Sequence, residues 1–179
     1  NIGTDSTLDI ITWNVENFPK HNITIDYMVE LIDTMNVDII ALQEIQRESD
    51  FNYLISVLEG WAGGFSKDPY GYGLAFLYKS DITVNFLGEI NELDNYNLPR
   101  TPFLIEINWE GEYIYIINNH YKCCGNGIIE NVYNDEEYRR QQACVLTENY
   151  INTELSDKNV IVLGDFNDEL NEEDANVFQ

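Results

Sequence analysis

The chain has 179 residues, enough for one domain with a sizeable core, and its 44% hydrophobic and 23% charged content is ordinary for a globular protein. Nine Lys and Arg stand against 32 Asp and Glu, so the formal net charge is −23. This balance excludes the overall basic footprint of a nonspecific nucleic-acid binder, and no apolar run reaches membrane-spanning length. An acidic coat that keeps the protein soluble is the favoured explanation of the charge.

The first part of the chain alternates predicted strands and helices. Apolar residues recur at helical spacing after Thr24, which we expect to cap the first helix. Glycines and a proline punctuate a later stretch and predict a loop there. In order, the expected elements are a strand over 8–13, a helix over 25–35, a strand over 37–42, a helix from about 49 and a loop over 61–70.

Strands dominate the second part. The expected elements are strands over 73–78, 83–88, 103–109 and 113–118, a helix over 135–154 and a strand over 160–163. Asn134 and Glu137 resemble a capping box for the long helix. Its basic pair, Arg139 and Arg140, is expected to form ion pairs with Asp135 or Glu136. Contact with a phosphate is the alternative. This order of elements suits two packed sheets with helices outside.

Polar side chains follow four of the predicted strands. They are Asn14; Gln43 and Glu44; Asn118, Asn119 and His120; and Asp165, Asn167 and Asp168. Functional groups gather beyond the carboxyl ends of strands in α/β sheets. Carboxylate and amide oxygens suit a hard divalent cation such as Mg²⁺ or Ca²⁺. The alternative, for the last group, is an Asn/Asp-rich turn.

Six short motifs in this order resemble the endonuclease/exonuclease/phosphatase superfamily, which has the deoxyribonuclease I-like fold. They are Thr12-Trp-Asn14, Ala41-Leu-Gln-Glu44, Tyr72-Gly-Leu-Ala-Phe-Leu-Tyr78, Arg100-Thr-Pro102, Asn118-Asn-His120 and Gly164-Asp-Phe-Asn167. The resemblance implies an α/β (α+β) fold, a four-layer α/β/β/α sandwich of two packed mixed sheets with helices outside. A site would then lie at one end, between the sheets.

The metal would be bound mainly by Glu44, because a carboxylate at the end of a buried strand is costly without a partner. Asn14 would orient Glu44 or ligate the ion directly. By resemblance, Asp165 would ligate the metal or orient the nucleophilic water, and Asn167 would bind phosphate. Mg²⁺ is the expected ion, with Mn²⁺ and Ca²⁺ as alternatives.

His120 is expected to transfer a proton or stabilise the transition state, since an imidazole titrates near neutral pH. By resemblance, Arg100 would support the site or touch a phosphate. Tyr70 is a candidate for lining the substrate groove.

The resemblance implies metal-assisted hydrolysis of a phosphodiester. We expect a secreted endonuclease that acts on DNA and possibly also RNA. Within the family, the alternative is a sphingomyelinase-like phosphodiesterase or phosphatase on lipid or inositol phosphates. A catalytically inactive binding module is the alternative from another class. An abasic-site repair enzyme is disfavoured because such relatives carry Tyr where His120 stands.

The family pattern continues beyond Gly164-Asp-Phe-Asn167 to an Asp-His segment that is not found here. The two histidines are His21 and His120, and neither follows an Asp. We therefore expect residues 1–179 to form a single domain that is incomplete at its C-terminus and nearly inactive alone. The remainder would be a further segment or a complementary fragment.

Three cysteines are present, and no Cys-x-x-Cys zinc spacing occurs. Cys144 is expected to form a disulfide with Cys123 or Cys124. Such a bridge would imply export, to the extracellular medium or the periplasm. The alternative is a cytoplasmic protein with three reduced thiols.

Overall fold

The structure is a computed structural model that describes residues 2–66 and 72–168. Tyr70, one of the expected substrate contacts, lies outside the described residues. The elements in chain order are β1 (Ile10–Phe18), α1 (Thr24–Met35), β2 (Ile39–Ile45), α2 (Glu48–Val57), β3 (Trp61–Phe65), β4 (Gly73–Lys79), β5 (Thr83–Glu89), the 3₁₀-helix η1 (Asn91–Leu93), β6 (Phe103–Trp109), β7 (Glu112–His120), α3 (Glu136–Glu154) and β8 (Asn159–Asp165). No helix in the described residues is long and apolar enough to cross a membrane.

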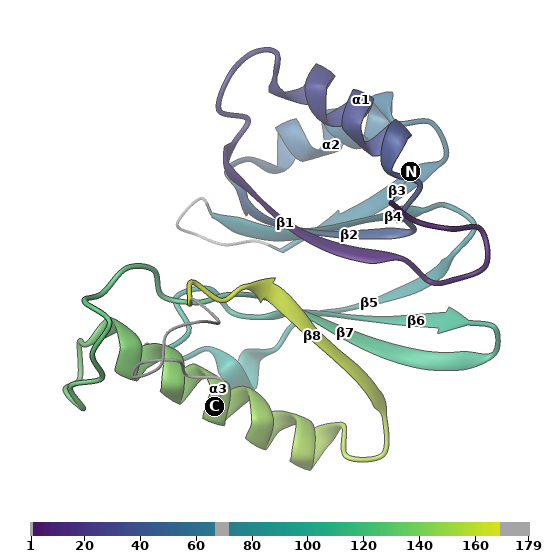
Figure 1. The fold of residues 1–179 in the computed structure, drawn as a ribbon. Coiled ribbons are helices and arrows are strands. Elements are labelled where there is room, and N and C mark those ends of the chain that lie inside the picture. The colour runs from purple at the N-terminus through teal and green to yellow at the C-terminus, as the bar shows by residue number, and fades with distance from the viewer. Residues whose placement is uncertain (1, 67–71, 169–179) are drawn as a thin grey trace.

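Two four-stranded sheets stack face to face. The first has the order β1-β2-β4-β3 and the second β5-β6-β7-β8. Strand β1 pairs parallel with β2, and β7 with β8, while the other pairs are antiparallel. Helices α1 and α2 cover the outer face of the first sheet, and α3 covers that of the second (Figure 1). The predicted four-layer sandwich of mixed sheets is confirmed.

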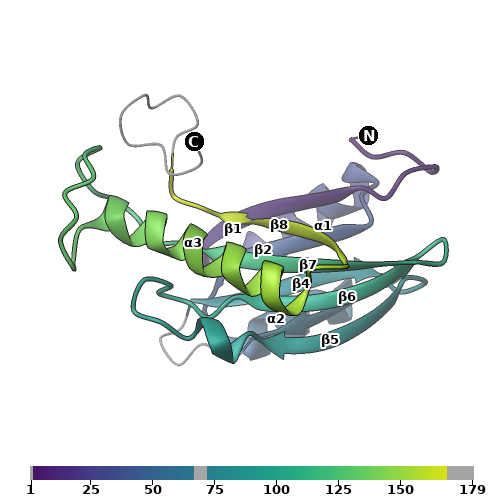
Figure 2. The same cartoon turned by 90° about the horizontal axis from the view of Figure 1, so that it is seen from below.

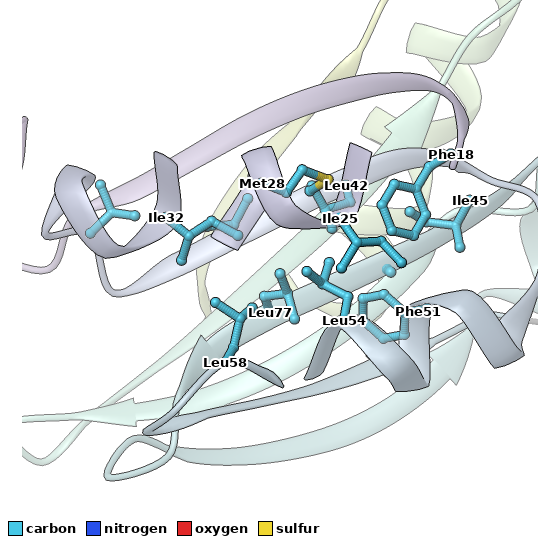
Figure 3. Packing of buried hydrophobic residues seen from close by; sticks show 13 residues of the cluster. Phe18, Ile25, Met28, Ile32, Leu42, Ile45, Phe51, Leu54, Leu58 and Leu77 are labelled. Atoms are coloured by element: carbon cyan, nitrogen blue, oxygen red, sulfur yellow. The ribbon is translucent and has the colours of Figure 1, made fainter. Parts of the chain in front are cut away.

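Three apolar clusters hold the four layers together. Side chains of α1 and α2, such as Met28 and Leu54, pack on Leu42 and Leu77 of the first sheet (Figure 3). A second cluster fills the space between the sheets, and a third lies between the second sheet and α3. Because each sheet buries residues on both faces, its strands read as nearly continuous apolar runs.

The expected loop over 61–70 is wrong in its first part, which forms the edge strand β3. Its glycines serve close packing rather than a turn. A Cβ on Gly63 would lie 2.7 Å from the carbonyl oxygen of Phe76 in the neighbouring strand. Glycine therefore allows β3 to approach β4, which local pattern alone does not reveal.

Both expected helix caps are wrong. Thr24 is the first residue of α1, and Ile23 precedes it without a side-chain cap. Asp135, not Asn134, caps α3 and accepts a backbone N–H of its first turn. Glu137 turns away from the helix start and accepts a hydrogen bond from the preceding loop.

Two buried amides connect the sheets close to the carboxyl ends of their strands. Gln43 Nε2, from β2, donates to Asn118 Oδ1, from β7, over 2.8 Å. Asn118 Nδ2 donates in turn to the carbonyl oxygens of Leu42 (3.0 Å) and Ala75 (3.1 Å) in the first sheet. Asn118 is fully buried, so these bonds are formed away from water. They fix how the two sheets sit on each other.

The buried amide contact predicts that alanine variants at two asparagines of the second sheet, Asn118 and Asn85, differ strongly in their free energy of unfolding. Asn118→Ala should lower the free energy of unfolding by about 2–4 kcal/mol, because it leaves buried polar partners unsatisfied. Asn85→Ala is the control, since Asn85 is exposed and its side chain bonds the half-buried Glu106 near the sheet surface. It should cost no more than about 0.5 kcal/mol. Urea unfolding curves measure both, and equal midpoints would contradict the structural role of Asn118.

Candidate active site

The carboxyl ends of four strands from both sheets meet at one end of the sandwich. In the parallel pair β1–β2, Asn14 lies opposite Gln43, and in β7–β8, His120 lies opposite Asp165. The edge strands β1 and β8 also contact each other across the sandwich, and Figure 2 shows them side by side. The polar residues that end these strands are therefore brought together although they are distant in the sequence.

Asn14 connects the two carboxylates of this group. Its Nδ2 donates to Glu44 Oε1 over 3.0 Å and to Asp165 Oδ2 over 2.6 Å. Its Oδ1 accepts the backbone N–H of Glu16. The amide therefore turns its N–H groups toward the carboxylates, which supports the orienting role among those expected of Asn14. Direct ligation by Asn14 stays a prediction.

His120 approaches both carboxylates from the buried side. Only 4% of its side chain is exposed, and Nε2 lies 3.9 Å from Glu44 Oε1 and 3.7 Å from Asp165 Oδ2. Both separations exceed a hydrogen bond but remain within reach of an ion pair. A protonated imidazole here would be stabilised by two negative charges. The geometry thus provides a group that can hold or release a proton beside the carboxylates.

Unusual backbone conformations place these side chains. Glu44 has a φ of 66° and Asn167 a φ of 52°, both in the left-handed region that non-glycine residues rarely adopt. The second oxygen of Glu44 accepts the N–H of Asn17 over 3.0 Å, which holds the carboxylate in place. Backbone strain of this kind is concentrated at functional sites.

The residues of this group fit a hard divalent cation. One oxygen each of Glu44 and Asp165 converges on the same Asn14 amide and the same His120 Nε2. A carboxylate oxygen can accept more than one interaction, so the protein hydrogen bonds do not exhaust these ligands. The two carboxylates repel each other, and a cation bound at them would reduce that repulsion. With His120 they do not form a group whose ligand atoms all lie within 4.8 Å of one another, so holding one ion would draw the two carboxylates closer together.

Asn167 is tied to the same strand end. Its backbone N–H donates to Asp165 Oδ1 over 3.0 Å, and its Nδ2 donates to the carbonyl oxygen of Tyr121 over 3.1 Å. These bonds fix the turn after β8. Phosphate binding by Asn167 stays a prediction.

Arg100 and Arg140 lie close to the carboxyl ends of β2, β7 and β8. The expected contact of Arg100 with the site or a phosphate stays a prediction. Arg100 precedes β6 and stacks over the ring of Tyr72 at 5.0 Å. Arg140 lies 4.0 Å from Glu137 and 3.5 Å from Asp168, while Arg139 stacks over Tyr96. Ion pairs with Asp135 or Glu136 were expected, and this is wrong for Arg140, which lies near Glu137 instead. The contact with Asp168 was not foreseen.

Sequence reasoning did not give Gln43 and Asn118 a role, although it placed both at strand ends. The structure makes them the buried support beneath Glu44 and His120, their neighbours in β2 and near the end of β7. Two consecutive asparagines before a histidine, at the end of an otherwise apolar strand, were the available signal.

One acidic group stands apart from this site. This group consists of Asp135, Glu136 and Glu137. Within residues 2–66 and 72–168, it is the only set of three His, Cys, Asp or Glu side chains whose ligand atoms all lie within 4.8 Å of one another. These residues begin α3, where the helix dipole favours negative charge. A structural explanation therefore suffices for them.

The expected disulfide is wrong, because all three cysteines are free. Cys144 lies on α3 and packs with Tyr121 and Phe166 in the core between helix and sheet. Cys123 and Cys124 are exposed on the loop after β7. The helix returns past this loop, as expected, but it turns the Cys144 side chain inward. Export, which rested on the bridge, stays a prediction without that support.

Comparison with known sequences identifies the family. The pattern of the endonuclease/exonuclease/phosphatase family matches residues 11–179. The chain belongs to this family. A search of the curated proteins gave no match.

Solved structures share the fold at low sequence identity. Humanized Danio rerio TDP2 is 21% identical with a TM-score of 0.68, over 92% of this chain and 64% of that one. The Neisseria 3′ phosphatase NExo, bound to a product DNA hairpin, is 23% identical with a TM-score of 0.61, over 90% and 58%. An AP endonuclease from Archaeoglobus fulgidus is 20% identical with a TM-score of 0.58, also over 90% and 58%. The chain thus spans less than two thirds of the length of these neighbours.

The proposed metal site at Glu44 and Asp165 predicts that the variant Glu44→Gln binds metal more weakly. Removing one of two carboxylates should weaken Mg²⁺ binding at least about tenfold, or about 1.4 kcal/mol. Glu16→Gln is the matched control, because Glu16 lies on β1 close by but is exposed and pairs with Lys20. Isothermal titration calorimetry compares the three proteins. Unchanged affinity in Glu44→Gln would remove Glu44 from the metal site.

The backbone at Gly164, near the end of β8, has a conformation and a close neighbour that only glycine allows. A substitution there is therefore predicted to lower stability. Its φ is 139°, and a Cβ there would lie 2.1 Å from the carbonyl oxygen of Asn119 in the paired strand. Gly88 also has a positive φ, of 105°, but open space around it. Gly88→Ala should cost about 1 kcal/mol of strain, and Gly164→Ala at least about 2 kcal/mol more. Thermal unfolding of the two variants measures the difference, and equal losses would show that the close approach is unimportant.

Proposed function

We propose that the protein is a divalent-metal-dependent phosphodiesterase that acts on nucleic acid, with DNA as its principal substrate. The observation that carries the proposal is the joining of Glu44 and Asp165, from different sheets, by the Asn14 amide beside the buried His120. Membership of the family supports phosphodiester hydrolysis as the class of reaction.

The carboxylates would bind the metal ion, and His120 would transfer a proton. Glu44 and Asp165 would hold a divalent cation, which would supply charge stabilisation at a phosphoryl oxygen. Asn14 keeps the two carboxylates in place through its paired N–H groups. A proton on His120 Nε2 would lie within reach of the same point, where it could serve the leaving oxygen or stabilise developing negative charge.

The proposed substrate rests on the molecules with which similar proteins have been solved. TDP2 from Danio rerio has been solved with a single-stranded DNA product, and the Neisseria phosphatase with a DNA hairpin. The net charge of −23 opposes binding of any polyanion. Divalent ions at the site would reverse the field locally, and salt confines exposed charges to about 10 Å at 0.1 M. Binding is therefore expected to depend on metal more than on a basic surface.

A substrate panel tests the proposal. Supercoiled plasmid, single-stranded DNA, RNA, sphingomyelin and inositol phosphates are each incubated with the protein and Mg²⁺, Mn²⁺ or Ca²⁺. Metal-dependent cleavage of DNA above the other substrates is expected. Turnover of the lipid or inositol phosphate alone would replace the nucleic-acid assignment. Metal binding without hydrolysis of any substrate would favour the binding-module alternative, or the incomplete domain expected from the sequence.

The two histidines provide a matched pair of variants. His120→Ala should lower kcat by about 10²–10⁴-fold while Mg²⁺ affinity is retained, since the imidazole acts on a proton rather than on the ion. His21→Ala should leave the rate unchanged, because His21 is exposed in the loop before α1. Initial rates and calorimetry on the same preparations check both statements. A rate in His120→Ala within about twofold of the parent would refute the catalytic role of His120.

A further inference from the structure

Two adjacent thiols lie in contact on the loop after β7. Cys124 Sγ donates to Cys123 Sγ over 2.8 Å, and both side chains are exposed. The third thiol, Cys144, is separate, and burial raises its pKa to about 11. At neutral pH, Cys144 is therefore protonated almost completely and unreactive toward disulfides. Within the described residues, Cys123 and Cys124 are therefore the thiols that a reagent in solution can reach and modify.

The backbone that carries this pair is held by α3. Arg140 Nη1 donates to the carbonyl oxygens of Lys122 (3.2 Å) and Cys124 (2.8 Å), on either side of Cys123. The loop continues through Gly125, whose φ is 115° and which leaves no room for a Cβ beside Glu137. The two thiols are thus presented on a fixed support.

We propose that Cys123 and Cys124 form a redox modification site, in which the dithiol is converted to a vicinal disulfide by a small-molecule disulfide. One cysteine thiolate attacks a sulfur of the small disulfide, forms a mixed disulfide and releases one thiolate. The second cysteine then attacks the protein sulfur, closes the ring and releases the other thiolate. The two protons lost by the cysteines end on the two released thiols, so two electrons pass to the small molecule.

The surroundings of the two thiols act in opposite directions and make the product easy to reduce. The hydrogen bond to Cys123 raises the pKa of Cys124, so Cys123, beside Lys122, is the better first nucleophile. Lys122 Nζ lies 3.7 Å from Cys123 Sγ, where its positive charge can contact the attacking or leaving thiolate. Adjacent Cα atoms stand about 3.8 Å apart, below the about 4.4–6.8 Å usual for disulfides, so the ring is strained. Strained and exposed disulfides are the easily reduced ones. The site therefore suits a switchable modification rather than a structural bridge.

The loop borders the strand end that carries the candidate active site. Cys124 and Gly125 line a hollow of about 220 Å³ together with Arg140, Asn167 and Asp168. The modification would lie beside the group of Asn14, Glu44 and Asp165, not within it.

Intact mass spectrometry tests the site. The reduced protein is incubated with oxidised glutathione, then denatured and alkylated. We expect the loss of two hydrogen masses and a single alkylated thiol, Cys144. The variant Cys144→Ser should lose the same mass and take no alkylation. Cys123→Ser and Cys124→Ser should instead each retain one glutathione, because the resolving thiol is missing.

Two results would overturn the proposal. Loss of two hydrogen masses in the parent but not in Cys144→Ser would show a bridge to the helix instead. Persistence of three alkylatable thiols in the parent at excess oxidised glutathione would show that the pair does not close. Dithiothreitol added after oxidation should restore three thiols, and peptide mapping places the bond between the adjacent cysteines.

Discussion

The contact between Gln43 and Asn118 is the constraint on which the candidate site depends. Each sheet supplies part of the site, with Glu44 in the first and Asp165 in the second. Apolar packing between the sheets is nearly non-directional and would tolerate small sliding. Hydrogen bonds from Asn118 to two carbonyl oxygens of the opposite sheet have one correct geometry, because the alternative is an unsatisfied buried amide. The hydrogen bonds of Gln43 and Asn118 therefore fix the position of one sheet relative to the other. The distance between the carboxylates of Glu44 and Asp165 is fixed with it.

The site assembled in this way concentrates negative charge, and its neighbours offset that charge. Asn14 directs both amide hydrogens at the carboxylates, and Asn17 adds a backbone N–H. These partial charges do not cancel two full ones, and the buried imidazole of His120 lies where a further positive charge is favourable. A divalent cation bound at the carboxylates would supply such a charge.

The loop after β7 shows how one helix connects two regions. Arg140 binds the backbone of the cysteine pair and also lies near Asp168, just beyond the strand that carries Asp165. A guanidinium offers several donors in a fixed plane, so it can hold both segments at once. Its burial in a chain with few basic residues indicates that these contacts, rather than solvent exposure, determine its position.

The sequence by itself determined the order of most strands and helices, the polar ends of four strands and the family, because periodicity and short motifs are local properties. Tertiary structure decided the rest. Strand β3 depends on glycines that fit against β4, and the cap of α3 depends on which side chain the preceding loop leaves free. The partners of Asn14 lie 30 and 151 residues away, and the inward turn of Cys144 depends on how α3 packs. Such contacts follow from strand register and layer packing, which no stretch of sequence encodes on its own.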